Sequence, residues 1–302
     1  MSIKYTVIVS AYNVEQYIEE AVNSVLNQSE KYFELIVIND CSTDSTLQIL
    51  NKISRVDSRL RIVNLQNNVG LSETRNIGLS YASGQWILFL DGDDTLNVSA
   101  LEKISRYTSE NDLIVFGFNK VTHDLGEVLS VFYPKMSLEG IYTGSWNKAY
   151  KHSLIKGMEF PKGRFFEDMA FTTIAFYKAE NRVGLVECPL LNYRMRPTSI
   201  TNTKNARRHL DVKYVLQDAV EYRDNNIHSS DIRDEINRMM NKQIFVHLFL
   251  AYRDRLSIGE FKMIFAELDK FRVDADLGDV FDMNCFKQFK NRLIYKYFKM
   301  IE

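Results

Sequence analysis

"YTVIVSAYNVEQYIEEAVNSVLNQ", residues 5–28, changes its hydrophobic period part-way along. Residues 5–10 form a β-branched run, which is typical of a strand buried on both faces of a sheet. From Tyr17 to Leu26 the apolar residues recur at helical spacing, which is typical of a helix with one buried face. The stretch therefore predicts a buried strand followed directly by a helix.

The same alternation continues as far as residue 91. Further strands are predicted at 33–40, 60–65 and 86–91, and further helices at 42–53 and 72–82. Strands that alternate with helices imply right-handed crossovers and a parallel sheet, so the fold class is α/β. Because ligands of such sheets bind beyond the carboxyl ends of the strands, we expect Asn13, Asp40 and Asp91 to surround one crevice.

The chain changes character near residue 200. A strand is predicted at 112–121, a helix from Phe166, and a pair of strands over 183–196 that is broken at Pro189. Residues 204–302 contain no proline and keep a helical pattern to the end. We therefore predict an α/β domain over 1–200 and a helical C-terminal region over 201–302.

Composition narrows the class of protein and its compartment. The 302 residues carry a net charge of -1, so no overall basic field recruits nucleic acid. Three scattered cysteines (Cys41, Cys188 and Cys285) match neither a zinc spacing nor a disulfide framework. The N-terminus has no signal-peptide pattern, and no stretch approaches the length of a membrane span. We expect a cytosolic protein without a nucleic-acid partner.

An acidic cluster follows the strand predicted at 86–91. Asp91, Asp93 and Asp94 repel one another unless a cation lies among them, although a solvated turn is the plainer interpretation of such a sequence. Two chemistries fit: a metal site that holds a nucleotide-sugar, or a haloacid-dehalogenase-type phosphatase with Asp91 as its nucleophile. The phosphatase requires its aspartates on the first strand, whereas three strand–helix units precede them here, which favours the metal site.

Several motifs, in this order and spacing, resemble one known family. They are VIVSAYNVEQYIEEAVNSVLNQ (7–28), FELIVINDCSTDST (33–46), NNVGLSETRNIGL (67–79), GQWILFLDGDD (84–94), WNKAY (146–150), FFEDMAF (165–171) and YRMRPTSI (193–200). Together they are similar to family-2 inverting glycosyltransferases of the GT-A fold, of the bacterial surface-polysaccharide type. The family often has a proline before the Tyr-Asn turn, where this chain has Ser10 and Ala11.

The resemblance implies a set of site residues. Asp168 is the expected general base, and Asp93 and Asp91 are the expected ligands of Mn²⁺ or Mg²⁺. The substrate-binding residues are expected to be Tyr12, Asn13, Asp40, Arg75, Asp91 and Lys148. The donor is expected to be a UDP-sugar, and the acceptor a glycan or a lipid-linked oligosaccharide.

Each assignment has a plainer alternative. Asp40 is a charged acceptor for uracil N3–H, or it caps the next helix. Tyr12 stacks on the base, or fills the rim of a groove. Arg75 contacts phosphate, or lies on a solvated helix face. Lys148, with Arg194 and Arg196, contacts the diphosphate or the acceptor, or is solvated charge.

Asp168 lies among apolar residues in the FFEDMAF motif. Burial of this kind raises a carboxyl pKa and makes its anion a better base. The alternative is that Glu167 and Asp168 complement the dipole at the start of a helix. The acidic cluster upstream favours the base.

The C-terminal residues 285–302 form an amphipathic basic segment. Such a helix lies in an anionic membrane interface or docks on the protein body, and the two remain equally favoured. The helical region is expected to make acceptor, membrane or oligomer contacts, a homodimer among them, with the protein in the cytoplasm or on the inner face of the cell membrane. A catalytically inactive scaffold is the remaining alternative.

Overall fold

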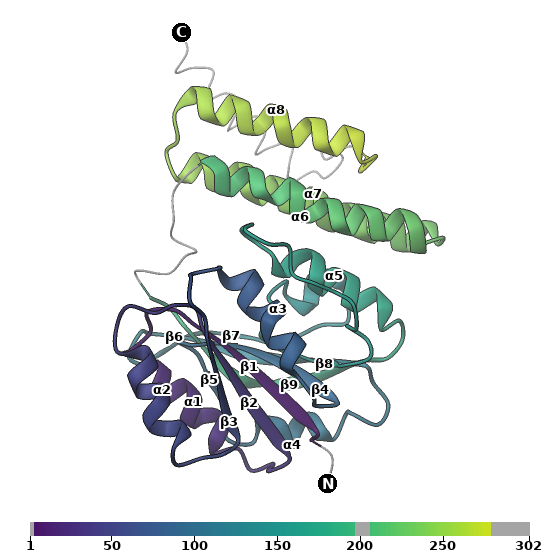
Figure 1. The fold of residues 1–302 in the computed structure, drawn as a ribbon. Coiled ribbons are helices and arrows are strands. Elements are labelled where there is room, and N and C mark those ends of the chain that lie inside the picture. Colours follow the sequence, from purple (N-terminus) through teal and green to yellow (C-terminus); the bar gives the residue numbers. More distant parts are fainter. Residues whose placement is uncertain (1–2, 197–205, 279–302) are drawn as a thin grey trace. The chain divides into compact units, whose positions relative to one another are not determined.

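A computed structural model describes residues 3–196 and 206–278, and the chain divides into two compact units, 1–203 and 204–302 (Figure 1). The first, the α/β unit, has the strands β1 (Tyr5–Ala11), β2 (Phe33–Asn39), β3 (Leu60–Asn64), β4 (Trp86–Asp91), β5 (Thr95–Leu96), β6 (Leu113–Val121), β7 (Val128–Phe132), β8 (Lys148–Lys151) and β9 (Val183–Arg194). Its helices are α1 (Ile18–Leu26), α2 (Thr46–Ser54), α3 (Leu71–Tyr81), α4 (Ala100–Ser105) and α5 (Asp168–Lys178), with a 3₁₀ turn at Leu138–Ile141.

One sheet organises the α/β unit. Its strand order is β3-β2-β1-β4-β8-β6-β9-β5, and β7 pairs with β6. The first four strands run parallel, whereas β8 joins β4 and β6 antiparallel. The predicted α/β fold with a mostly parallel sheet is confirmed.

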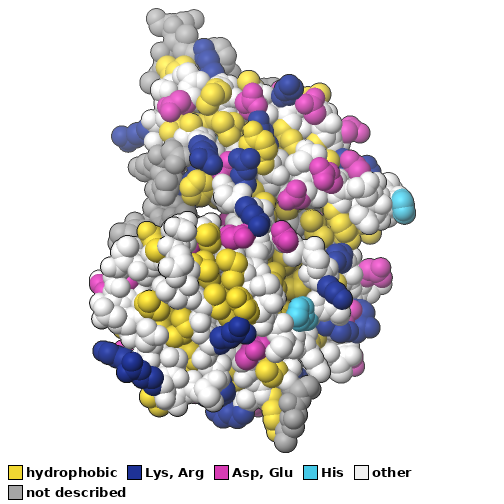
Figure 2. Space-filling view, viewed as in Figure 1, with side chains coloured by type: hydrophobic (Ala, Val, Ile, Leu, Met, Phe, Trp, Pro, Cys, Tyr) yellow, Lys and Arg dark blue, Asp and Glu magenta, His cyan; other side chains and the backbone are white. Residues whose placement is uncertain are grey.

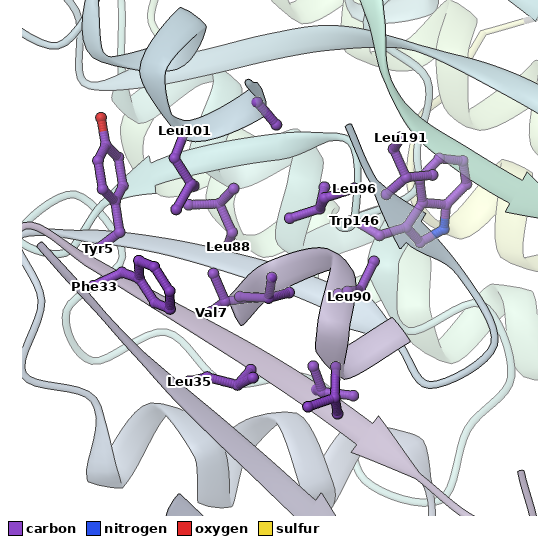
Figure 3. Packing of buried hydrophobic residues seen from close by; sticks show 14 of the residues in the cluster. Tyr5, Val7, Phe33, Leu35, Leu88, Leu90, Leu96, Leu101, Trp146 and Leu191 are labelled. Atoms are coloured by element: carbon purple, nitrogen blue, oxygen red, sulfur yellow. The ribbon is translucent and has the colours of Figure 1, made fainter. Parts of the chain in front are cut away.

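Helices cover both faces of this sheet because its strands are apolar on both sides. On one face Val7 lies in register with Leu35 and Leu88, in the core packing seen in Figure 3. On the other face α3 approaches so closely that a Cβ on Gly78 would lie 2.3 Å from Ile8 Cγ2. This glycine therefore sets the distance between α3 and the sheet.

The strand pair predicted over 183–196 is wrong in one respect. β9 is a single strand that passes through Pro189 and pairs with β6 along its whole length. The register jumps from Phe116↔Val186 to Gly117↔Pro189, which accommodates the missing N–H as a bulge.

The second unit, the helical unit, consists of α6 (Ala206–Asn226), α7 (Ser230–Arg253) and α8 (Ile258–Asp274) in its described part. α8 begins with a capping box between Ser257 and Glu260. Across residues 3–196 and 206–278, no helix is both long and apolar enough to cross a membrane. The predicted amphipathic segment 285–302 lies outside the described residues.

The described surface carries no single-sign field on the face seen in Figure 2. Basic and acidic side chains are interspersed there, as expected for a net charge of -1.

Candidate active site

Three neighbouring strands deliver the candidate residues to one edge of the sheet. The Asp40 N–H donates to the Ala11 carbonyl (2.8 Å) and the Gly92 N–H donates to the Ser10 carbonyl (3.0 Å). The loops after β1, β2 and β4 are therefore tied together where these parallel strands end. A Cβ on Gly92 would lie 2.9 Å from the Ser10 carbonyl oxygen, so only glycine fits between the aspartates.

Asp40 holds the loop that precedes α3. Its two carboxylate oxygens accept the N–H groups of Val69 (2.7 Å) and Gly70 (2.9 Å), and the residue is buried. It caps neither end of α2, so the capping alternative is wrong. Because a carboxylate offers about four acceptor positions, this arrangement leaves capacity for a uracil N3–H.

Tyr12 and Asn13 form the turn after β1. Tyr12 is 49% exposed, which leaves its ring open to a stacking partner. Asn13 has a left-handed backbone (φ 49°), and its side-chain oxygen accepts the Thr43 N–H (2.8 Å). Asn13 therefore fixes the loop after β1 to the loop after β2, and a direct donor contact stays a prediction.

Arg75 joins three carboxylates. Its Nη1 donates to Glu167 Oε1 (2.8 Å) and Asp168 Oδ1 (2.7 Å), and its Nη2 donates to Asp91 Oδ1 (3.0 Å). The residue is 1% exposed, so the solvated-face alternative is wrong. Burial by itself lowers the pKa of Arg75, but Asp168, Asp91 and Glu167 outweigh it and raise that pKa, so the guanidinium stays charged.

The carboxylates at the start of α5 differ in exposure. The Asp168 side chain keeps 18% of its surface exposed, and that of Glu167 keeps 10%. Burial, followed by the charge of Asp168, raises the pKa of Glu167 to about 7. Asp168 is thus held by Arg75 and can still be reached by a substrate. The burial that the apolar motif predicted for Asp168 is greater at its neighbour Glu167.

Asp93 and Asp94 have different partners. Burial, together with the nearby charge of Asp91, raises the pKa of Asp93, and its Oδ2 lies 2.5 Å from Arg196 Nε. Asp94 is buried, and its Oδ1 accepts the Arg194 N–H (2.8 Å), which fixes the end of β9. Asp94 is therefore a structural residue here.

Lys148 is a buried anchor for the preceding loop. Its Nζ, which has three N–H donors, lies within hydrogen-bond distance of four oxygens: the carbonyls of Ile141 (3.0 Å), Tyr142 (2.7 Å) and Gly144 (2.7 Å), and Asn147 Oδ1 (2.7 Å). The residue is 0% exposed, and burial lowers its pKa. The solvated-charge alternative is wrong for Lys148, and its contact with a diphosphate stays a prediction.

The donor set at Asp91 and Asp93 suits a hard divalent cation. Carboxylate oxygens are the ligands that Mg²⁺ and Mn²⁺ prefer, and the raised pKa of Asp93 reflects burial and repulsion that a cation would relieve. Within the described part of the chain, no three His, Cys, Asp or Glu side chains are grouped to hold a metal. The two aspartates therefore suit a cation whose remaining ligands come from a diphosphate and water.

The sequence analysis considered Glu167 and Arg194 but missed the roles that the structure gives them. Glu167 was considered only as a dipole partner, although adjacent carboxyls in an apolar motif are a signal for one raised pKa. Arg194 is 4% exposed; its Nε donates to the Asp93 carbonyl (2.7 Å) and its Nη2 to Glu20 Oε2 (2.5 Å). Glu20 lies on α1, far away in sequence, so no local signal reveals this pair.

Comparison with known proteins identifies the family. The model of the Glycosyl transferase family 2 matches residues 6–171, which include the candidate residues from Tyr12 to Asp168 but not Arg194 and Arg196. The chain belongs to this family. The phosphatase alternative is thereby removed, in agreement with the position of Asp91 on the fourth strand rather than the first.

Relatives and solved structures agree with the assignment. An uncharacterized glycosyltransferase of Haemophilus influenzae is 46% identical over 109 residues, which are 36% of this chain and 34% of that one. The poly(ribitol-phosphate) beta-N-acetylglucosaminyltransferase TarS of Staphylococcus aureus is 33% identical over 226 residues, 70% of this chain and 38% of TarS. The chain thus spans little more than a third of either relative.

Two solved structures share the fold. TarS 1-349 in complex with UDP-GlcNAc has a TM-score of 0.76 at 24% identity, covering 89% of this chain and 80% of that one. The Pyrobaculum calidifontis mannosyltransferase PcManGT, in complex with GDP-Man and Mn²⁺, has a TM-score of 0.60 at 16% identity and covers 94% and 89%. These likenesses establish the GT-A type of fold for this chain.

Proposed function

We propose that the chain transfers a hexose from a UDP-sugar to a hydroxyl of a glycan or lipid-linked acceptor, with inversion at the anomeric carbon. The observation that carries the proposal is the cluster in which buried Arg75 joins Asp91 to Asp168, with Asp93 alongside. Asp91 lies where a donor diphosphate is expected, and Asp168 is a reachable carboxylate held beside it. Family membership and the UDP-GlcNAc bound by TarS support the choice of donor.

The residues of the cluster have different roles in a single displacement reaction at the anomeric carbon. Asp168 accepts the proton of the acceptor hydroxyl while that oxygen attacks the anomeric carbon. The bond from this carbon to the diphosphate oxygen breaks, and UDP leaves with the bonding electrons. Arg75 orients Asp168 through a 2.7 Å bond and places its positive charge beside Asp168 and Asp91.

The donor site is assembled from the loops at the strand ends. Tyr12 offers an exposed ring for the uracil face, and Asp40 offers a carboxylate for its N3–H. Asp93, with Asp91, would hold Mn²⁺ or Mg²⁺ against the diphosphate. Such a cation supplies electrostatic stabilisation of the leaving group, and the Mn²⁺ in the PcManGT complex supports this choice.

The setting is surface-polysaccharide synthesis. TarS acts, by its name, on poly(ribitol-phosphate), and a 30% identical relative from Bacillus subtilis is named a putative teichuronic acid biosynthesis glycosyltransferase. An acceptor of this class places the enzyme in the cytoplasm, against the inner face of the membrane if residues 285–302 bind there. We assign residues 1–200 to catalysis and residues 201–302 to acceptor, membrane or oligomer contacts.

Calorimetry with UDP tests the donor site. UDP should bind the wild-type chain, and Mn²⁺ should strengthen that binding. Asp93→Ala should bind UDP with no gain from Mn²⁺. Asp112→Ala, which removes a carboxylate paired with Lys151 and Arg182, should behave as wild type. UDP binding that ignores both Mn²⁺ and Asp93→Ala would refute the metal site. A chain that binds UDP with Mn²⁺ yet transfers no sugar to any acceptor tested would favour the inactive scaffold.

A further inference from the structure

Asp93 forms an ion pair with Arg196. Arg196 Nε lies 2.5 Å from Asp93 Oδ2, and the guanidinium of Arg196 lies over the Tyr17 ring at 5.4 Å. The side chains of Asp93 and Arg196 are 14% and 19% exposed, so the pair is largely shielded from water. In such surroundings an ion pair is stronger than one on the open surface.

Arg194 and Arg196 are held very differently, although only one residue separates them. Arg194 donates to the Asp93 carbonyl, to the His123 carbonyl and to Glu20, and its side chain is only 3% exposed. Arg194 is thereby fixed to backbone and to α1. Arg196 instead points its charge at the carboxylate assigned above to the cation, and its greater exposure gives it room to leave.

The Arg196 guanidinium, 2.5 Å from Asp93 Oδ2, repels a divalent cation that would bind the same carboxylate. We propose that Arg196 is a positioning residue that competes with the divalent cation for Asp93, so that the cation binds well only together with a nucleoside diphosphate. This inference rests on the proposed function. The diphosphate supplies oxygen ligands for the cation, and it supplies negative charge that accepts the displaced guanidinium.

The competition has a measurable size. We expect the loss of one ion pair that is largely shielded from water to change an equilibrium constant by about tenfold. Arg196→Gln removes the charge and keeps much of the side-chain length. The variant should therefore bind Mn²⁺ about tenfold more tightly than wild type without nucleotide. At saturating UDP, where the guanidinium has already left Asp93, the two proteins should bind Mn²⁺ alike.

The experiment is a titration of the full chain with Mn²⁺, followed by the electron paramagnetic resonance signal of free Mn²⁺, with and without saturating UDP. Because coupling is reciprocal, the factor by which UDP tightens Mn²⁺ binding should also fall about tenfold in Arg196→Gln. Arg106→Gln, which removes an exposed arginine paired with Glu102, is the control and should match wild type. Asp93→Asn should lose the Mn²⁺ site in both conditions.

The outcomes separate this inference from the proposed function. If Arg196→Gln binds Mn²⁺ no more tightly than wild type without UDP, while UDP still enhances Mn²⁺ binding in both, the competition is refuted and the metal site stands. If UDP fails to enhance Mn²⁺ binding in the wild-type chain itself, the metal site falls and the competition falls with it.

Discussion

At the scale of single residues, one guanidinium determines how the site is charged. Arg75 contacts Asp91, Glu167 and Asp168, so one positive charge faces three acidic groups. The raised pKa of Glu167, about 7, follows from its burial and the neighbouring charge of Asp168. This leaves Asp168 as the partly exposed carboxylate of the pair, the one suited to receive a proton.

Asp168→Asn tests this assignment. Asparagine keeps the shape and an oxygen for Arg75 but removes the basicity, so transfer should fall by about 10²- to 10⁴-fold. UDP binding measured by calorimetry should survive. Asp112→Asn, which removes a carboxylate paired with Lys151 and Arg182, is the control and should transfer sugar at the wild-type rate. A wild-type rate in Asp168→Asn would reduce Asp168 to a helix-terminal charge.

At the scale of elements, the ends of strands and the loops beyond them are fixed by buried polar side chains. Asp40 holds the loop before α3, and Lys148, at the start of β8, holds residues 141–147. Tyr142 in that loop has a left-handed backbone with φ 59°, a conformation that costs a non-glycine residue about 1 kcal/mol or more. The contacts of Lys148 with the loop carbonyls offset this cost.

Lys148→Met should therefore destabilise the α/β unit. The substitution leaves four oxygens without their common donor, and we expect a loss of about 3 kcal/mol, measured as a lower melting temperature in circular dichroism. Lys151→Met is the matched control at the other end of β8. The Lys151 side chain is 40% exposed and paired with Asp112, so its loss should cost no more than about 1 kcal/mol. An unchanged melting temperature in Lys148→Met, with weaker UDP binding, would instead support a diphosphate contact.

At the scale of the whole molecule, the two units differ in their buried histidines, which lie in the helical unit among the described residues. The helical unit buries His209 and His247, with His209 Nε2 3.4 Å from Asp254 Oδ2. Burial, followed by the neighbouring charges of His209 and Arg208, lowers the pKa of His247 to about 3. The folded helical unit therefore keeps His247 neutral at a pH where the unfolded chain would protonate it.

The sign of the pH effect follows from this difference. Since the unfolded histidine titrates near 6.5, the stability linked to His247 is fully present above that pH and is lost as the pH falls towards 3. Thermal melts of the full chain should show this loss between pH 7 and 4.5, and His247→Leu should lose less stability over the same range. His228→Leu, at an exposed position, should follow the wild-type profile. Parallel profiles for wild type and His247→Leu would contradict the expectation.

The amino-acid sequence alone was enough to predict the α/β fold, the family and the approximate edge of the sheet where the candidate site lies. These features rest on local information: a β-branched run such as residues 5–10, a helical period, or a carboxylate directly after a strand. Because parallel strands end at one edge, even the gathering of Asp40 and Asp91 followed from local pattern and topology.

The contacts of the charged side chains became known only from the folded structure. Arg75 and Lys148 have the residue types expected of phosphate ligands, yet here they are buried against acidic groups and carbonyl oxygens. The partners of Arg75 lie as far as 93 positions away in sequence, and Arg194 pairs with Glu20 across 174 positions. Contacts over such separations depend on how the chain folds. Periodicity, composition and motif spacing are local properties and do not predict them.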